Sequence, residues 1–83
     1  MNYCVYIVRC SDGTLYTGIT NDINRRVKEH NGSSRGAKYT RSRRPVILAY
    51  SSLIGTRSMA LKEEYRIKKL NRAEKLKLIL NKE

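Results

Sequence analysis

Acidic residues are scarce in this sequence. Seven Asp and Glu stand against 18 Lys and Arg among 83 residues, which gives a formal net charge of +11. Such an excess surrounds a small protein with a positive field and favours a polyanionic partner. Charge alone does not show whether the partner is a nucleic acid or an anionic membrane surface, or whether the protein is ribosome-associated or merely basic.

Large apolar aromatics and cysteines are also rare. Phe and Trp are absent, so the six Tyr supply all aromatic surface, and each hydroxyl needs a partner or water. Cys4 and Cys10 are the two cysteines, and in one strand their Cα atoms would lie about 20 Å apart, too far for a disulfide. One histidine and no CxxC motif give no zinc signature, so we expect free thiols in a reducing compartment.

Long hydrophobic runs are missing as well. No segment is apolar enough to cross a bilayer, and "MNYCVYIVRCSDG" lacks the basic region and small-residue cleavage site of a signal peptide. We therefore expect a cytoplasmic protein that does not bind membranes. The length fits one domain, residues 1–83, and we expect a monomer without a small-molecule cofactor.

Two β-prone segments, residues 3–10 and 14–20, predict a hairpin. If the turn has three residues with Gly13 in the left-handed region, Tyr6 lies opposite Gly18 and shares a face with Tyr16. A two-residue turn would put the two tyrosines on opposite faces.

The segment "TNDINRRVKEHNG" predicts a helix capped at Asn21 or Asp22 and ending at residues 31–32. At about 100° per residue, His30 shares the apolar face and Arg26 lies on its flank, so both lean toward the hairpin. Three charged side chains are expected to point away: Arg25, Lys28 and Glu29.

Residues 32–45 carry five basic groups and no acidic group among Gly and Ser, which predicts a mobile, solvated loop able to clamp a phosphate backbone. Residues 46–54, "VILAYSSLI", predict a third strand, and their apolar run favours a central, covered position.

A long helix is predicted from Arg57, with Glu64 on the arc that includes Ala60, Leu61 and Ile67. A capping box at residues 71–74 predicts a last helix, with an apolar stripe of Leu76, Ile79 and Leu80. The order ββαβαα indicates an α+β fold: a single domain with a three-stranded antiparallel sheet flanked by helices.

Each polar candidate has an ordinary structural explanation. Strand tyrosines usually pack, exposed arginines usually face solvent, and Glu64 with Lys68 has the spacing of a helical ion pair. Together, however, tyrosine, arginine, histidine and glutamate are the groups that phosphodiester hydrolysis needs to move a proton and to stabilise charge. Nearby arginines and a metal would be expected to lower the pKa of a tyrosine.

The motifs resemble those of the GIY-YIG nuclease superfamily, in particular its small stand-alone YhbQ-type members. "CVY" at 4–6 is similar to the GIY element, with Cys4 and Val5 for Gly and Ile, and "YTG" at 16–18 is similar to YIG, with Thr17 for Ile. "TNDINRRVKEH" resembles the family's arginine-bearing helix, and "MALKEEYRIKKLNRAEKLKLI" its glutamate-bearing and closing helices.

The resemblance implies a metal-dependent endonuclease that hydrolyses phosphodiester bonds in DNA. It implies Tyr6 as general base, Tyr16 as an orienting group and Arg26 as transition-state cation. His30 would contact phosphate or share a proton, and Glu64 would hold a single Mg²⁺ or Mn²⁺, while Gly18 leaves space beside Tyr6.

Two other functions stay open: a non-catalytic nucleic-acid-binding module that keeps the nuclease fold, and a subunit of a larger repair or RNA-processing complex. Either way a nucleic acid, with DNA favoured, is the expected partner. The basic residues expected to grip its phosphates are Arg25, Arg35, Lys38, Arg41, Arg43, Arg44 and Lys68.

Overall fold

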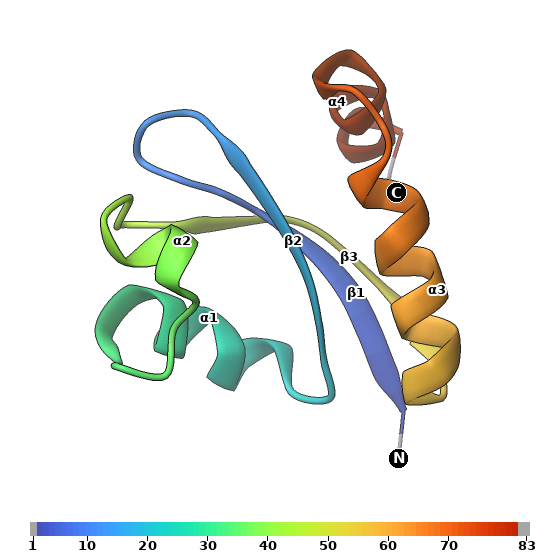
Figure 1. Ribbon diagram of the computed structural model, residues 1–83, viewed down its shortest axis with the longest axis horizontal. Coiled ribbons are helices and arrows are strands. Elements are labelled where there is room, and N and C mark those ends of the chain that lie inside the picture. The colour runs from blue at the N-terminus through green and yellow to red at the C-terminus, as the bar shows by residue number, and fades with distance from the viewer. Residues whose placement is uncertain (1, 82–83) are drawn as a thin grey trace.

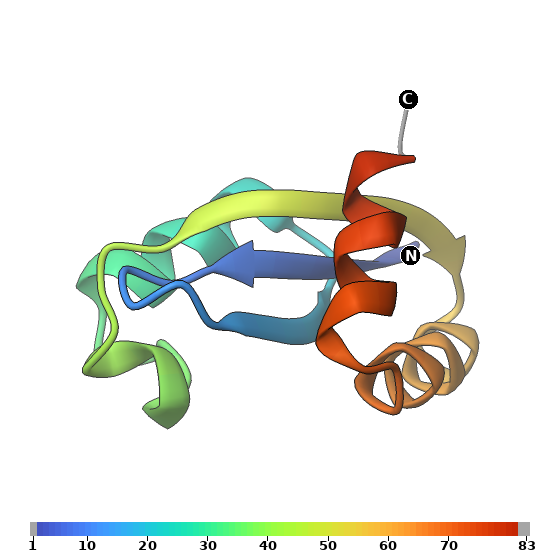
Figure 2. The same cartoon turned by 90° about the horizontal axis from the view of Figure 1, so that it is seen from above.

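Three antiparallel strands in the order β2-β1-β3 form the sheet. The computed structural model describes residues 2–81; α1 and α2 lie at one end of the sheet, and α3 and α4 at the other (Figures 1 and 2). The elements are β1 (Tyr3–Arg9), β2 (Leu15–Thr20), α1 (Ile23–Gly32), α2 (Lys38–Arg41), β3 (Ile47–Gly55), α3 (Arg57–Lys68) and α4 (Arg72–Leu80). The α+β prediction is confirmed, with one short helix added to the expected order.

The β1–β2 hairpin has the three-residue turn. Gly13 has a φ of 84°, in the region that glycine adopts most readily, and the Cys10 amide donates to the Thr14 carbonyl (2.8 Å). Tyr6 pairs with Gly18. Because Tyr16 pairs with Val8, two residues along β1 from Tyr6, the two tyrosines share a face, as expected for a three-residue turn.

The prediction that the third strand is central was wrong. β1 is central, and β3 is an edge strand in which Ile47 and Leu53 keep 68% and 70% of their surface exposed. The apolar run indicated burial on both faces, but residues at the ends of an edge strand extend past the elements that cover the sheet. An apolar run reports hydrophobicity and not the position of a strand in its sheet.

Successive side chains of β1 point to opposite faces of the sheet and form two small cores. Tyr6, Val8 and Cys10 pack with Val46 on the face that α1 covers, and Tyr16 and Ile23 add to this cluster. On the other face Val5 and Ile7 pack against Ile67 of α3, with Leu78 and Ile79 of α4 beside them. The stripe expected on α4 was partly wrong, since Leu80 is 77% exposed and Leu78 takes its place.

The helix starts follow the sequence signals. Asp22 caps α1 by accepting from the Arg25 amide (3.1 Å), and Asn71 and Glu74 form the expected capping box of α4. Both cysteines are free, in agreement with their spacing. Within residues 2–81, no helix is long and apolar enough to cross a membrane.

Residues 32–45 are ordered, and the prediction of a mobile loop was wrong. They contain α2, and the Thr40 side chain is fully buried. The Arg44 guanidinium donates to the carbonyls of His30 and Ser33, which fastens the segment to the end of α1. The basic, Gly- and Ser-rich composition indicated a solvated loop. Composition does not show that a cation such as Arg44 binds backbone carbonyls instead of water.

Candidate active site

Tyr6 lies at the centre of the site. It sits on the central strand with 1% of its surface exposed, and its ring extends across Gly18 of β2. A Cβ atom added at Gly18 would lie 2.6 Å from the Tyr6 hydroxyl oxygen and 2.8 Å from the ring carbon that bears it. The missing side chain at position 18 is therefore what lets Tyr6 reach its partners, as the pairing predicted.

Two side chains of α1 meet the Tyr6 hydroxyl. The oxygen lies 2.8 Å from His30 Nε2, and Arg26 Nε donates to it at 3.4 Å. Both residues thus lean toward the hairpin, as the helical spacing predicted. Arg26 is held in turn by the Glu29 carboxylate (3.0 Å) and by the Arg35 carbonyl (2.9 Å).

Glu29 was expected to point away from the hairpin, and this was wrong. Its side chain is 17% exposed and forms ion pairs with Arg26 (3.0 Å) and Arg25 (3.7 Å). The helical wheel placed it beyond the apolar arc but did not include the attraction of the cations one turn away.

Buried hydrogen bonds link Tyr6, His30 and Thr40, and the hydrogen bond of Thr40 indicates where the protons lie. Thr40 Oγ1 lies 2.9 Å from the Ala37 carbonyl oxygen and 2.9 Å from His30 Nδ1. The Thr40 hydroxyl donates its one hydrogen to the Ala37 carbonyl, so its oxygen accepts from Nδ1–H. In a neutral ring Nε2 is then unprotonated and accepts from Tyr6.

Burial decides the charge of both rings. It raises the pKa of Tyr6 to about 12, although the hydrogen bond and charge of Arg26 act in the opposite direction. Burial, with a contribution from the Arg26 charge, lowers the pKa of His30 to about 4. The expected lowering of the tyrosine pKa is thus not found in the protein alone: at neutral pH the pair is a phenol and a neutral imidazole.

Tyr16 completes an aromatic cluster on the same side. Its ring meets His30 edge-on with centroids 5.4 Å apart, and it stacks on Tyr39 of α2 at 5.7 Å. The Arg43 guanidinium lies 4.0 Å from the centre of the Tyr39 ring. Tyr16 therefore lies beside the Tyr6–His30 pair.

Glu64 approaches from α3. Its side chain is 18% exposed, its charge contributes to raising the pKa of Tyr6, and it forms the expected ion pair with Lys68 (3.1 Å). No cluster of three or more Asp, Glu, His or Cys occurs in the part of the chain described here. One carboxylate suits Mg²⁺, which keeps several waters and takes further oxygen ligands from phosphate.

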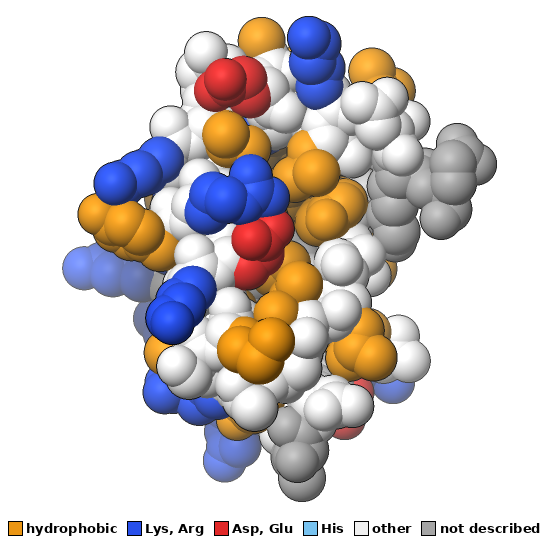
Figure 3. All heavy atoms as spheres, turned by 90° about the vertical axis from the view of Figure 1, so that its right-hand side faces the viewer, with side chains coloured by type: hydrophobic (Ala, Val, Ile, Leu, Met, Phe, Trp, Pro, Cys, Tyr) orange, Lys and Arg blue, Asp and Glu red, His pale blue; other side chains and the backbone are white. Residues whose placement is uncertain are grey.

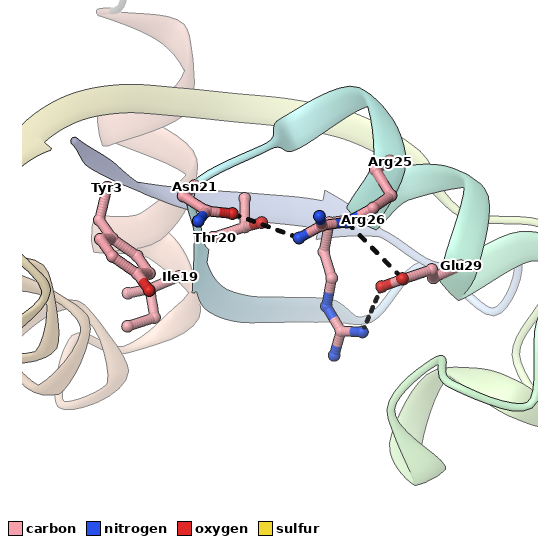
Figure 4. Close-up of a pocket in the computed structure, with 7 residues that line it drawn as sticks. All are labelled: Tyr3, Ile19, Thr20, Asn21, Arg25, Arg26 and Glu29. Carbon is pink, nitrogen blue, oxygen red and sulfur yellow. Dashed lines mark hydrogen bonds and ion pairs between the residues drawn. The ribbon is translucent and has the colours of Figure 1, made fainter. Parts of the chain in front are cut away.

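An open pocket of about 340 Å³ adjoins Arg26. Figure 4 shows side chains of α1 and of the β2–α1 connection on one side, with Tyr3 across from them. Its lining residues are Tyr3, Ile19, Thr20, Asn21, Arg25, Arg26 and Glu29. The pocket offers room for part of a ligand beside the Tyr6 cluster.

The family follows from comparison with known proteins. The model of the GIY-YIG catalytic domain matches residues 2–77, nearly the whole chain. The chain belongs to the GIY-YIG family. This confirms the resemblance seen in the motifs, and it places the protein in a nuclease domain family.

Relatives of this GIY-YIG protein carry the name UPF0213. The UPF0213 protein DP2720 of Desulfotalea psychrophila is 59% identical over 75 residues, 90% of this chain and 68% of the relative. A UPF0213 protein of Staphylococcus aureus is 55% identical over 78 residues, 94% of each chain.

Two solution structures share the fold. That of the UPF0213 protein BH0048 of Bacillus halodurans is 44% identical, with a TM-score of 0.64 over 99% of this chain and 86% of that one. That of EF2693 of E. faecalis is 41% identical, with a TM-score of 0.65 over 100% of this chain and 91% of that one.

Five of the seven basic residues expected to bind nucleic acid divide into two groups in this GIY-YIG chain. Arg43 pairs with Asp12 (3.0 Å), Arg41 donates to the Ser34 carbonyl (2.8 Å), and Arg44 binds the end of α1. The side chains of Arg35 and Lys38 are exposed, and within residues 2–81 neither takes part in a hydrogen bond or ion pair. The second group is the better placed to meet phosphate.

The remaining two candidates, Arg25 and Lys68, are engaged with acidic side chains. Arg25 pairs with Glu29 (3.7 Å) and lines the pocket, whereas Lys68 pairs with Glu64. Figure 3 shows the face that carries α3 and α4, where basic side chains alternate with apolar ones and form no continuous basic patch.

Sequence reasoning missed Thr40 and Tyr39, which α2 brings to the site. Both lie in a basic segment without periodicity, so no local pattern singled them out. Their positions follow from contacts with α1 and with the hairpin.

Proposed function

We propose that this GIY-YIG protein is a divalent-metal-dependent endonuclease that hydrolyses phosphodiester bonds in DNA. The observation that carries the proposal is the Tyr6 hydroxyl, buried between an imidazole nitrogen and a guanidinium. A neutral tyrosine is a poor base, but a tyrosine that can pass its proton to His30 can accept another from water.

The step is a relay of two protons. Tyr6 Oη accepts a proton from the attacking water and gives its own proton to His30 Nε2, while the water oxygen bonds to phosphorus and the bond to the leaving oxygen breaks. Arg26 meets the negative charge that gathers on the phosphate oxygens. Tyr16, beside the pair, orients the water or the phosphate.

Glu64 is the residue that would hold the metal. GIY-YIG nucleases generally use a divalent metal, and a single half-buried carboxylate suits Mg²⁺ or Mn²⁺ completed by water and substrate oxygens. Bound there, such an ion would supply positive charge next to the phosphate. In the free protein the Glu64 carboxylate pairs with the Lys68 ammonium instead.

The test is cleavage of plasmid, duplex, nicked, branched and single-stranded DNA with Mg²⁺, with Mn²⁺ and with a chelator. We expect metal-dependent cleavage that falls at least about 100-fold in Glu64→Ala and in Tyr6→Phe, because proton transfer and charge stabilisation each contribute at that scale. Glu63→Ala is the matched control, since Glu63 precedes Glu64 on α3 and pairs instead with Arg66.

Equal cleavage by wild type, Glu64→Ala and Tyr6→Phe would identify a contaminating nuclease. The second candidate is a non-catalytic nucleic-acid-binding module, and the Glu64–Lys68 pair favours it, because a neutralised carboxylate does not oppose a polyanion. That function would show as DNA binding that needs no metal and no Glu64, with intact substrate at the end of every reaction.

A further inference from the structure

We infer that Thr40 is a positioning residue that holds the proton of His30 on Nδ1 and so keeps Nε2 free to receive the proton of Tyr6. The tautomer assignment stands on the geometry alone. Its consequence for the reaction rests on the proposed nuclease function.

The hydrogen bonds at the two ends of the Tyr6–His30–Thr40 chain agree on one tautomer. The Thr40 hydroxyl donates its one hydrogen to the Ala37 carbonyl, so its oxygen accepts from Nδ1–H. The Tyr6 hydroxyl oxygen accepts from Arg26 Nε, and its own hydrogen goes to Nε2. In the other tautomer of a neutral ring, Nδ1 would turn a lone pair toward Oγ1, and Nε2 would turn a hydrogen toward Tyr6. Tyr6 would then have lost its proton acceptor.

Burial makes this constraint effective. His30 and Thr40 are fully buried, so water does not provide substitute partners for the imidazole or for the hydroxyl that binds it. The ring can also take a second proton without rearrangement. When Nε2 receives the proton of Tyr6, Nδ1–H still donates to Thr40 Oγ1, and both nitrogens of the imidazolium have acceptors.

The backbone of α2 holds Thr40 in place. The Ala37 carbonyl also accepts from the Thr40 amide (3.0 Å), and the Thr40 carbonyl accepts from the Arg43 amide (3.0 Å). Arg44 ties the end of this segment to the His30 carbonyl. The segment that carries Thr40 is thus fastened to the residue whose side chain Thr40 orients.

The single histidine of the chain makes a direct test simple. Long-range ¹H–¹⁵N NMR spectra report which imidazole nitrogen is protonated, and His30 gives the only such signals. At neutral pH, without metal or DNA, we expect the Nδ1–H tautomer in wild type and in Thr40→Ser. In Thr40→Val, which keeps the shape but removes the hydroxyl, we expect the Nε2–H tautomer to gain population.

Thr17→Val is the matched control. Thr17 is buried like Thr40 (3% exposed), but its hydroxyl has no hydrogen-bond partner within residues 2–81, and it lies on β2 away from His30. This substitution should leave the tautomer unchanged. Dispersed amide spectra of all variants would show that each one folds.

Cleavage assays supply the second measurement. We expect Thr40→Val to lower the cleavage rate at least about tenfold, with Thr40→Ser and Thr17→Val close to wild type. An unchanged Nδ1–H tautomer in Thr40→Val would overturn the assignment, and an unchanged rate despite a shifted tautomer would overturn the positioning role. If wild type fails to cleave any DNA, the proposed function fails, while the tautomer measurement still decides whether Thr40 orients the ring.

Discussion

At the scale of single residues, Tyr6 reaches His30 and Arg26 because its cross-strand neighbour, Gly18, has no side chain. The ring crosses position 18 so closely that a methyl group there would lie 2.6 Å from the hydroxyl oxygen. Carbon atoms do not approach an oxygen so closely without displacement, so either the ring or the strand must move.

Gly18→Ala should therefore displace Tyr6 from His30 and Arg26. We expect the free energy of unfolding to fall by about 1–3 kcal/mol, the usual cost of overpacking, and cleavage to fall with it. Urea denaturation measures the first effect and the nuclease assay the second.

Gly32→Ala is the control, because a Cβ atom at Gly32 would meet nothing within 4 Å. It should keep both stability and activity. A Gly18→Ala variant as stable and active as Gly32→Ala would show that the ring does not need the space.

At the scale of elements, the C-terminus of α1 is held by a side chain from another segment. Arg44 donates to the carbonyls of His30 and Ser33, which have no partners within the helix. A cation at this end also opposes the negative pole of the helix dipole. Arg44, expected from the sequence to bind nucleic acid, thus makes structural contacts beside His30.

Arg44→Met should lower the free energy of unfolding by about 1–2 kcal/mol, since it removes charged hydrogen bonds from half-buried carbonyls. Arg35→Met is the comparison, because the Arg35 side chain is exposed and its change should stay within about 0.5 kcal/mol. Thermal and urea unfolding of both variants check this. Equal stabilities of the two variants would show that the contacts of Arg44 with the end of α1 do not stabilise the fold.

At the scale of the whole molecule, the charge of +11 is spread over lysines and arginines with different partners. Several bind backbone carbonyls or acidic side chains, which leaves fewer cations for a polyanion than the composition suggests. Arg35 and Lys38 are free to contribute, and both lie in the segment that carries α2.

DNA binding should weaken steeply with salt, and less steeply in an Arg35→Met/Lys38→Met double variant. If both side chains contact phosphate in duplex DNA, the slope of log K against log salt should decrease in magnitude by up to about 2. Fluorescence anisotropy between about 50 and 200 mM salt measures this. Glu64→Ala should bind as wild type does or more tightly, and identical slopes for wild type and the double variant would place the binding surface elsewhere.

Sequence reasoning was accurate wherever neighbours along the chain decide the structure. The capping box at Asn71 is a local motif and is confirmed, and the turn at Gly13 is the three-residue one of the two lengths that the sequence left open. Three predictions were wrong: a central third strand, a mobile loop around Thr40 and a Glu29 side chain that points away from the hairpin. Each of these features depends on partners distant in sequence or on charge pairing that periodicity ignores.

The sequence by itself determined the family, since motif spacing is a property of the chain. Strand alternation limited the hairpin to two registers, and the structure has the one that places Tyr6 over Gly18. Only the tertiary structure decided the protonation of the buried pair. Burial raises the pKa of Tyr6 and lowers that of His30, and a carbonyl in a segment without periodicity orients the ring through Thr40. Desolvation and hydrogen-bond direction depend on which groups meet in space, and the order of residues does not state that.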